Sequence, residues 1–241
     1  MNDQLGKLMK QAQKMQADMM EEQEKLNSMV FKGSAGGGMA EVVVNGKMEI
    51  TDIKIMPEGP EVKIASSYYN SFFDGAKNIT FELLTEYYEK KYADVFECIK
   101  QHHPKDFQAT FTIGKNIFLP LSNGQYFNFH LGMTGGWSEN NIKHCHFKVS
   151  ADDRELFFRD IRKFGKMRIL NKEQIQQKHF NTYDFLNKDY DFDKHVKYLK
   201  QKVSHGKSVC STLMDQRFFP GVGNYIKSEA LYAAKLHPEK Q

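Results

Sequence analysis

Cysteine is scarce in this chain of 241 residues, and its placement excludes two classes of small protein. Cys98, Cys145 and Cys210 are odd in number and form no Cys-x-x-Cys pair, which excludes a disulfide framework and a four-cysteine zinc site. No apolar run approaches the ~20 residues that a membrane-spanning helix needs, and the first thirty residues are too charged for a signal peptide. We therefore expect a reduced, cytoplasmic protein with no metal and no cofactor.

Proline and glycine are also few, at 6 and 17 residues, which excludes a collagen-like chain. The content of 40% hydrophobic residues excludes a disordered chain. The excess of positive charge is small, +4 overall, but it is unevenly placed. Residues 1–55 carry seven Lys against eight Asp and Glu, a balance of −1, whereas residues 56–241 carry 27 Lys and Arg against 22 Asp and Glu, a balance of +5. This weak basic bias permits a polyanionic partner without proving one.

Apolar residues in the first thirty positions recur at spacings of three and four, interrupted at Glu22: Leu5, Leu8, Ala12, Met15, Met19, Leu26 and Met29. Such a narrow seam predicts a helix that buries one stripe against another helix. Homodimerisation through residues 5–29 and packing against the rest of the same chain are both compatible with it. The helix is expected to end near a glycine cluster at 33–38, followed by a hairpin of residues 39–44 and 47–55 around Asn45-Gly46.

The pattern changes after residue 55. A short amphipathic helix is predicted over 63–75, several β-rich runs over 79–170, and a helix from Asp191 with an apolar stripe of Phe192, Val196, Leu199 and Val203. Two more helices are predicted at 209–214 and 225–234, on either side of Pro220-Gly221-Val222-Gly223. This order of elements predicts an α+β fold. His144, Cys145 and His146, and the pair Cys98 and His102, lack further ligands at a spacing that would close a metal site.

The first 55 residues resemble the YbaB/EbfC family of nucleoid-associated, dimeric DNA-binding proteins. The resemblance rests on Leu8-Met-Lys-Gln-Ala-Gln-Lys-Met-Gln16, Gly33-Ser-Ala-Gly-Gly-Gly38 and the Asn45-Gly46 hairpin. It covers only half of that family's domain, because the second long helix expected after the hairpin is replaced by an unrelated sequence.

From Met56 to the last residue the chain resembles the formamidopyrimidine-DNA glycosylase/endonuclease VIII (Fpg/Nei) family of base-excision repair enzymes. The matching segments are Met56-Pro-Glu-Gly-Pro-Glu-Val62, Gly114-Lys115, His130-Leu-Gly-Met-Thr-Gly135, Phe158-Arg-Asp-Ile-Arg-Lys-Phe-Gly165 and Leu213-Met-Asp-Gln-Arg-Phe-Phe-Pro-Gly-Val-Gly-Asn-Tyr225. The resemblance implies a partial YbaB/EbfC-like segment at 1–55, a catalytic β-sandwich at 56–172 and an all-α helix-two-turn-helix module at 173–241. The family's C-terminal finger is expected to be missing, because the sequence stops at Gln241.

The same resemblance implies two sets of DNA contacts. A glycosylase that extrudes a base must fill the vacated space, and Met133, Arg162 and Phe164 match the family's wedge. An apolar chain, a planar cation and an aromatic ring are the side chains that such a wedge needs. A second set, expected to hold phosphate at the turn before the last helix, consists of Arg217, Gly221, Gly223 and Asn224.

The catalytic residues implied by the family are Pro57, Glu58, Glu61 and Lys115. A proline amine attacks the sugar C1′ and gives an iminium, Glu58 protonates the sugar ring oxygen, Glu61 organises the pocket, and Lys115 contacts the phosphate of the target nucleotide. The implied activity is excision of oxidised bases from double-stranded DNA, with cleavage at abasic sites.

Pro57 conflicts with this mechanism, because its nitrogen is a tertiary amide that cannot attack when Met56 precedes it. Either translation starts at Met56, or a protease frees Pro57, or the fused chain lacks the activity. The alternative function is that of a non-catalytic, nucleoid-associated DNA-binding protein, and a further alternative is that two reading frames were joined artificially. The expected location is the cytoplasmic nucleoid, or the nucleus in a eukaryote.

Overall fold

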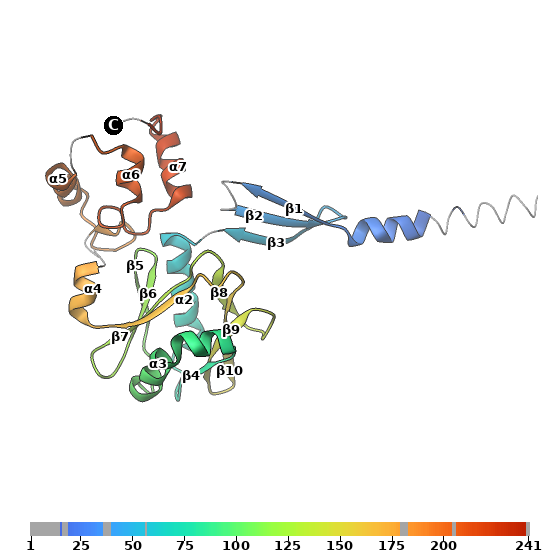
Figure 1. The fold of residues 1–241 in the computed structure, drawn as a ribbon, viewed down its shortest axis with the longest axis horizontal. Helices are drawn as coiled ribbons and strands as arrows, with labels where there is room; N and C mark the ends of the chain where they lie inside the picture. Colours follow the sequence, from blue (N-terminus) through green and yellow to red (C-terminus); the bar gives the residue numbers. More distant parts are fainter. Residues whose placement is uncertain are drawn as a thin grey trace, which may run out of the picture. The chain divides into compact units, whose positions relative to one another are not determined.

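The computed structural model describes residues 15, 19–35, 40–55, 57–178, 183–203 and 206–239, and the chain divides into two units after Ile55. In unit 1, residues 19–28 are helical and are followed by β1 (Val30–Ala35), β2 (Ala40–Asn45) and β3 (Ile50–Ile55). The three strands form an antiparallel sheet in the order β1-β2-β3 (Figure 1).

The hairpin expectation is confirmed by the β2–β3 pair, but β1 was missed. Residues 30–35 were expected to lie at the end of the helix, whereas Val30 to Ala35 pair with β2. β-Branched and aromatic residues at 30 and 31 favour a strand, and the helix stops before them. Gly46 is required in the turn because a Cβ there would lie 1.6 Å from the backbone oxygen of Leu26.

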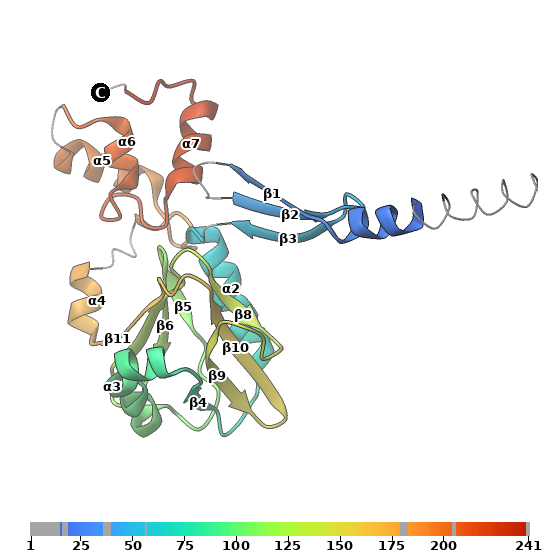
Figure 2. The same ribbon diagram turned by 45° about the vertical axis from the view of Figure 1, so that its right-hand side comes forward.

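Unit 2 contains a β-sandwich made of two four-stranded antiparallel sheets, in the orders β4-β9-β10-β8 and β11-β7-β6-β5 (Figures 1 and 2). The strands are β4 (Thr80–Leu83), β5 (Phe111–Ile113), β6 (Asn116–Pro120), β7 (Tyr126–His130), β8 (Gly135–Ser138), β9 (Cys145–Ala151), β10 (Arg154–Asp160) and β11 (Lys166–Leu170). Alternating strand positions fill the core with aromatic rings, among them Phe127, Phe129, Phe147 and Phe158.

Two helices close the open sides of this sandwich. α2 (Gly59–Phe73) contacts the edge strands β5 and β8, one from each sheet, and α3 (Glu86–His102) contacts β4 and β11. Each helix therefore covers two strand edges that would otherwise expose unpaired backbone groups. α2 begins four residues earlier than predicted, because Glu58 and Glu61 form a capping box and Pro60 suits the first turn.

α3 lies in a segment that was predicted to be β-rich, and that prediction is wrong for residues 86–102. Tyr88, Tyr92, Phe96 and Ile99 are its buried residues and follow helical spacing. Their aromatic side chains favour strands as isolated residues, but their period of three to four places them on one face of a helix against the sandwich.

The remaining helices follow the sandwich: α4 (Lys172–Lys178), α5 (Phe192–Lys202), α6 (Val209–Met214) and α7 (Asn224–Ala233). Asp191 caps α5 by accepting a hydrogen bond from the backbone N–H of Lys194. The buried residue of α5 is His195, whereas Phe192 of the predicted apolar stripe is 67% exposed. The α+β fold with a sandwich and an α-helical module is as expected. None of the helices in the described ranges combines the length and apolar character that a bilayer crossing needs.

Candidate active site and DNA groove

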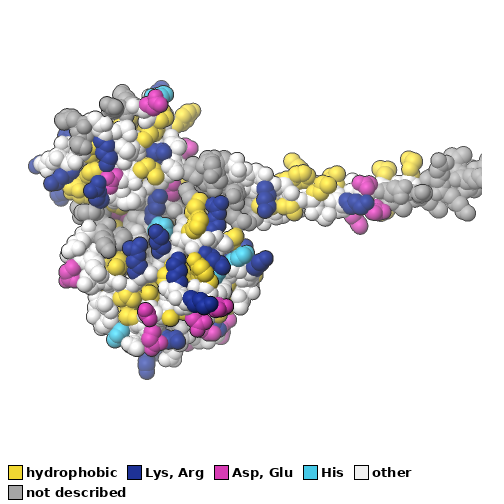
Figure 3. Space-filling view, in the orientation of Figure 1, with side chains coloured by type: hydrophobic (Ala, Val, Ile, Leu, Met, Phe, Trp, Pro, Cys, Tyr) yellow, Lys and Arg dark blue, Asp and Glu magenta, His cyan; other side chains and the backbone are white. Residues whose placement is uncertain are grey.

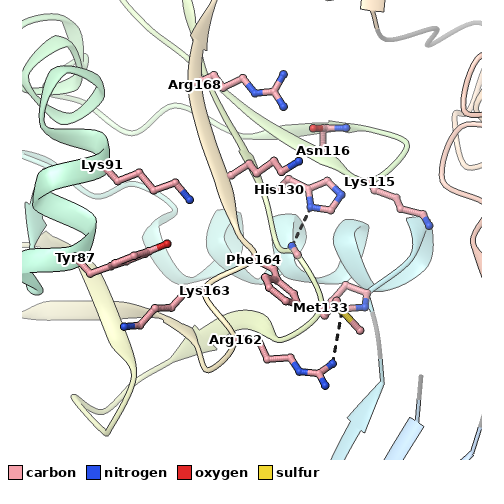
Figure 4. A pocket seen from close by; sticks show the side chains of 13 residues that line it. Tyr87, Lys91, Lys115, Asn116, His130, Met133, Arg162, Lys163, Phe164 and Arg168 are labelled. Carbon is pink, nitrogen blue, oxygen red and sulfur yellow. Dashed lines mark hydrogen bonds between the residues drawn. The ribbon is translucent and has the colours of Figure 1, made fainter. Parts of the chain in front are cut away.

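A cavity of about 910 Å³ lies in unit 2 and brings together five of the residues predicted from sequence: Pro57, Lys115, Met133, Arg162 and Phe164 (Figure 4). They come from the start of α2, the β5–β6 turn, the β7–β8 loop and the β10–β11 loop. The fold therefore assembles one groove from four separate segments.

Glu58 stands beside Pro57 and is fully buried. Its carboxylate accepts three backbone hydrogen bonds from the start of α7: Gly223 N–H to Oε2 at 2.7 Å, Tyr225 N–H to Oε1 at 3.1 Å and Ile226 N–H to Oε2 at 3.3 Å. The anion at this helix N-terminus is thus Glu58 itself. A DNA phosphate at this turn, as expected from the sequence, therefore cannot use these three amides, because Glu58 already accepts from them.

Glu61, in the first turn of α2, also links this helix to α7. Its carboxylate accepts the backbone N–H of Glu58 at 3.0 Å and the hydroxyl of Tyr225 at 2.8 Å to each oxygen. Burial, together with the nearby Glu61 charge, raises the pKa of Tyr225, so this hydroxyl stays protonated and donates. Glu61 therefore fixes both Glu58 and α7.

Lys115 and Glu58 both approach the Cα of Gly223. A Cβ added to Gly223 would lie 2.1 Å from Oε1 of Glu58 and 2.4 Å from Nζ of Lys115, so only glycine fits there. Burial lowers the pKa of Lys115, while the charges of Glu58 and Glu61 oppose that shift. A partly buried amine with a lowered pKa is suited to moving protons at the groove.

Gly221 is held by packing within the protein. Its φ is +90°, in the left-handed region, and a Cβ would lie 3.1 Å from Cα of Gly59. The Gly59 N–H donates to the Gly221 carbonyl at 2.9 Å, which joins the start of α2 to the turn before α7. Packing inside the protein accounts for Gly221 and Gly223, and their contact with DNA stays a prediction.

The three wedge residues lie on two loops that touch each other. Nη1 of Arg162 lies 3.6 Å from Sδ of Met133, and Phe164 is 53% exposed although it is aromatic (Figure 4). Gly132, with φ +68°, lets the loops meet, because a Cβ there would lie 2.6 Å from the backbone carbon of Phe164. An exposed ring on a glycine-dependent loop is typical of a binding residue, and this exposure shows that Phe164 is not part of the core.

Sequence reasoning missed the residue that holds this loop. Asp160 is fully buried, and its carboxylate accepts hydrogen bonds from Thr134 Oγ1 at 2.7 Å, Gly165 N–H at 2.7 Å and Tyr88 O–H at 3.2 Å. Thr134 in turn accepts the backbone N–H of Arg162 at 3.0 Å. A carboxylate two residues before Arg162 and four before Phe164 was the available signal.

The two remaining predicted residues lie outside this groove. Arg217 makes two hydrogen bonds to Asp215, at 3.0 and 2.7 Å, and lines a different depression together with Lys202 and Lys207. Hydrogen bonds from Arg217 and Lys207 hold the pKa of Asp215 well below its usual range. Asn224 is the first residue of α7, and its Oδ1 accepts from Nζ of Lys227 at 3.0 Å.

The walls of the groove are cationic. Among the described residues that line it, six are Lys or Arg and none is Asp or Glu: Lys91, Lys115, Arg162, Lys163, Lys166 and Arg168. Figure 3 shows Lys and Arg side chains gathered, with hydrophobic side chains between them, on the face of unit 2 in view. Within the described parts of the chain, no group of three His, Cys, Asp or Glu side chains could hold a metal ion.

A β-sandwich followed by an α-helical module, with a cationic groove lined also by Met133 and Phe164, is the architecture of a DNA-repair glycosylase. Residues 56–167 match the formamidopyrimidine-DNA glycosylase N-terminal domain, and residues 1–63 match the YbaB/EbfC DNA-binding family. The formamidopyrimidine-DNA glycosylase of Wolbachia sp. subsp. Brugia malayi is 32% identical over 193 residues, which cover 76% of this chain and 68% of that protein. The chain belongs to the formamidopyrimidine-DNA glycosylase family.

Other relatives agree with this assignment. The Lactococcus lactis subsp. cremoris formamidopyrimidine-DNA glycosylase is 27% identical over 77% of this chain and 70% of its own length, and the match to the Rickettsia bellii enzyme spans 48% of that protein. A solved structure of MutM in complex with DNA containing carbocyclic 8-oxo-G has a TM-score of 0.62 at 25% identity and covers 77% of this chain and 72% of its own. At the N-terminus, a Legionella pneumophila nucleoid-associated protein is 48% identical over 56 residues, which is 23% of this chain and 50% of that protein.

Proposed function

We propose that unit 2 is a base-excision repair DNA glycosylase that removes oxidised bases and then cleaves the strand at the abasic site. The observation that carries this proposal is the placement of Pro57 and Lys115 in the same groove as Met133, Arg162 and Phe164. An extruded nucleotide needs a reacting group and a wedge within one binding site, and the groove offers both. Oxidised or abasic duplex DNA is the proposed substrate.

The proposed chemistry uses a free amine at Pro57. Its nitrogen attacks C1′, the glycosidic bond breaks as the base leaves with a proton, and the sugar ring opens to an iminium with O4′ protonated. Loss of a proton from C2′ then expels the 3′ phosphate, and water hydrolyses the iminium to release the enzyme. The Glu58 carboxylate is proposed to take the proton that the Pro57 amine loses on attack and to deliver it to O4′. Lys115, close to Glu58, is suited to contact phosphate and to supply the proton with which the base leaves.

This chemistry needs a secondary amine, and the Met56–Pro57 peptide bond removes it. We therefore propose that the active form begins at Pro57 and that the full chain binds damaged DNA without forming the iminium. Glu58 and Lys115 keep the same neighbours in either form, because their partners all lie in unit 2.

Borohydride trapping on an abasic-site oligonucleotide tests this proposal. A chain that starts at Pro57 should be trapped, whereas the full chain, verified by mass to retain Met1, should not. The Pro57→Ala variant of the shortened chain should trap far less, and its remaining primary amine accounts for any residue of activity. Equal trapping of the full chain would assign the nucleophile to another amine such as Lys115.

A second candidate function concerns unit 1. Among the described members of its seam, Met15, Met19, Leu26 and Met29 are 64%, 69%, 51% and 51% exposed, while Leu5, Leu8 and Ala12 lie outside the described residues. Exposed apolar side chains in a seam favour a partner helix. We propose that residues 5–29 pair two copies of the chain and that unit 1 adds DNA association at the nucleoid.

A further inference from the structure

A second cluster of side chains lies in the groove, apart from the residues of the proposed chemistry. Tyr87 and Lys91 belong to α3, and Lys163 belongs to the β10–β11 loop. Nζ of Lys163 lies 4.5 Å from the centroid of the Tyr87 ring, and Nζ of Lys91 lies 5.6 Å from it. Figure 4 shows the Tyr87 side chain between the two lysines. We call these three residues the α3 arm.

The α3 arm is charged, exposed and not neutralised. In the part of the chain that the structure describes, neither Lys91 nor Lys163 forms an ion pair with a carboxylate, and contact with Tyr92 raises the pKa of Lys91. Lys90, one position earlier, is instead paired with Glu86 on the surface of α3. Tyr87 is 43% exposed, so a large ring stands open between two cations.

The side chains of the α3 arm indicate the chemistry of its ligand. Ammonium groups bind phosphate oxygens, and an exposed ring between them packs against a sugar or a base. No acidic residue lines the cavity in the described chain, so a polyanion meets no repulsion along its length. The arm shares the cavity with Arg162, which places its ligand on the same molecule that the wedge enters.

The position of the α3 arm indicates which DNA strand it contacts. In Figure 4 the wedge of Met133, Arg162 and Phe164 lies between Lys115 on one side and the α3 arm on the other. The extruded nucleotide must pass toward Pro57 and Lys115. The complementary strand then lies on the opposite side of the wedge, where the arm is.

We propose that Tyr87, Lys91 and Lys163 bind the backbone of the undamaged strand, so that the protein holds duplex DNA more tightly than the damaged single strand. This inference rests on the proposed function for the position of the lesion. It assigns to α3 a binding task beyond its task of closing the sandwich.

The test measures binding by the full chain to a duplex that carries a tetrahydrofuran abasic analogue and to the same lesion strand alone. Lys91→Ala should weaken duplex binding about eightfold at 0.1 M salt and lower the slope of log K against log salt by about 0.9, since one phosphate contact is lost. Single-strand binding should change less than twofold. Tyr87→Ala should weaken duplex binding with the salt slope unchanged, and Tyr87→Phe should restore it.

Lys90→Ala is the matched control, because it removes an adjacent lysine that Glu86 already neutralises. Equal effects of Lys90→Ala and Lys91→Ala would overturn the proposal, and so would an equal loss on duplex and single strand. The same measurements on an undamaged duplex separate this inference from the proposed function. Wild-type protein that ignores the lesion would contradict the glycosylase, whereas the comparison of duplex with single strand tests the arm in either case.

Discussion

The most informative single substitution is Glu58→Gln, because Glu58 is at once the proposed proton donor and the cap of α7. Its Oε2 accepts from Gly223 and Ile226, and its Oε1 accepts from Tyr225. A glutamine keeps the shape of the side chain but offers one acceptor oxygen in place of two. Its NH₂ group must then face a backbone N–H that has no other partner.

The cost follows from these contacts. With the NH₂ in the Oε1 position, Tyr225 N–H loses its acceptor, a loss of about 1–3 kcal/mol for a buried donor. The two bonds that remain change from charged to neutral, and about 1 kcal/mol is lost from each. The opposite rotamer leaves two donors unsatisfied and costs more. We expect unit 2 to lose about 3–5 kcal/mol, a fall of about 6–20 °C in its unfolding midpoint.

Thermal unfolding of the Pro57-start protein, followed by circular dichroism, measures this loss, and Glu82→Gln serves as the control because its side chain is 62% exposed. Base excision and cleavage of a preformed abasic site are then compared well below the unfolding midpoint. If Glu58 protonates the sugar, excision falls more than cleavage, whereas a purely structural role lowers both equally. A Glu58→Gln protein as stable as the wild type would refute the assignment of Glu58 as the cap of α7.

Three further outcomes are expected. Asp160→Asn should destabilise unit 2 by about 2–4 kcal/mol, measured by denaturant unfolding. In single-turnover assays it should slow excision from duplex DNA more than cleavage of an abasic single strand. Thr134→Ser should keep the hydrogen bond to Asp160 and the activity. Burial lowers the pKa of His103 from 6.5 to about 4, so the unfolded chain binds a proton before the folded chain does as pH falls. The free energy of unfolding of the wild type should therefore fall by up to about 3 kcal/mol between pH 6.5 and 4. This loss should be absent from His103→Phe. Glu at both Met15 and Met19 should abolish self-association in analytical ultracentrifugation, and an unchanged mass would exclude the dimer.

Much of the fold could be predicted because its signals are local. The helices at 209–214 and 224–233 follow from apolar spacing around a glycine-rich turn, and β2 and β3 follow from alternation around Asn45-Gly46. α3 was missed although its buried residues recur at helical spacing, because its tyrosines and phenylalanine favour strands as individual residues. β1 was also missed, because its strand-favouring residues Val30 and Phe31 directly follow the apolar seam of the helix.

The site residues also divide into those with a local sequence signal and those without one. Short motifs at turns identified Pro57, Lys115 and the three proposed wedge residues, and the structure brings them into one groove, while their roles stay predictions. The partners of Glu58 could not be foreseen, because they lie 165 to 168 residues away in sequence. A bare Gly-x-Gly predicts a close approach but does not say to what.

Glu58 and Gly223 show why this matters for the chemistry. A side chain at position 223 would displace both the Glu58 carboxylate and the Lys115 amine, so the glycine sets the distance between a proposed acid and a proposed base. The start of α7 therefore fixes the two groups to which the proposed chemistry assigns proton transfer. It follows that Gly223→Ala should impair excision even on substrates that bind normally, because the extra methyl group separates Glu58 from Lys115.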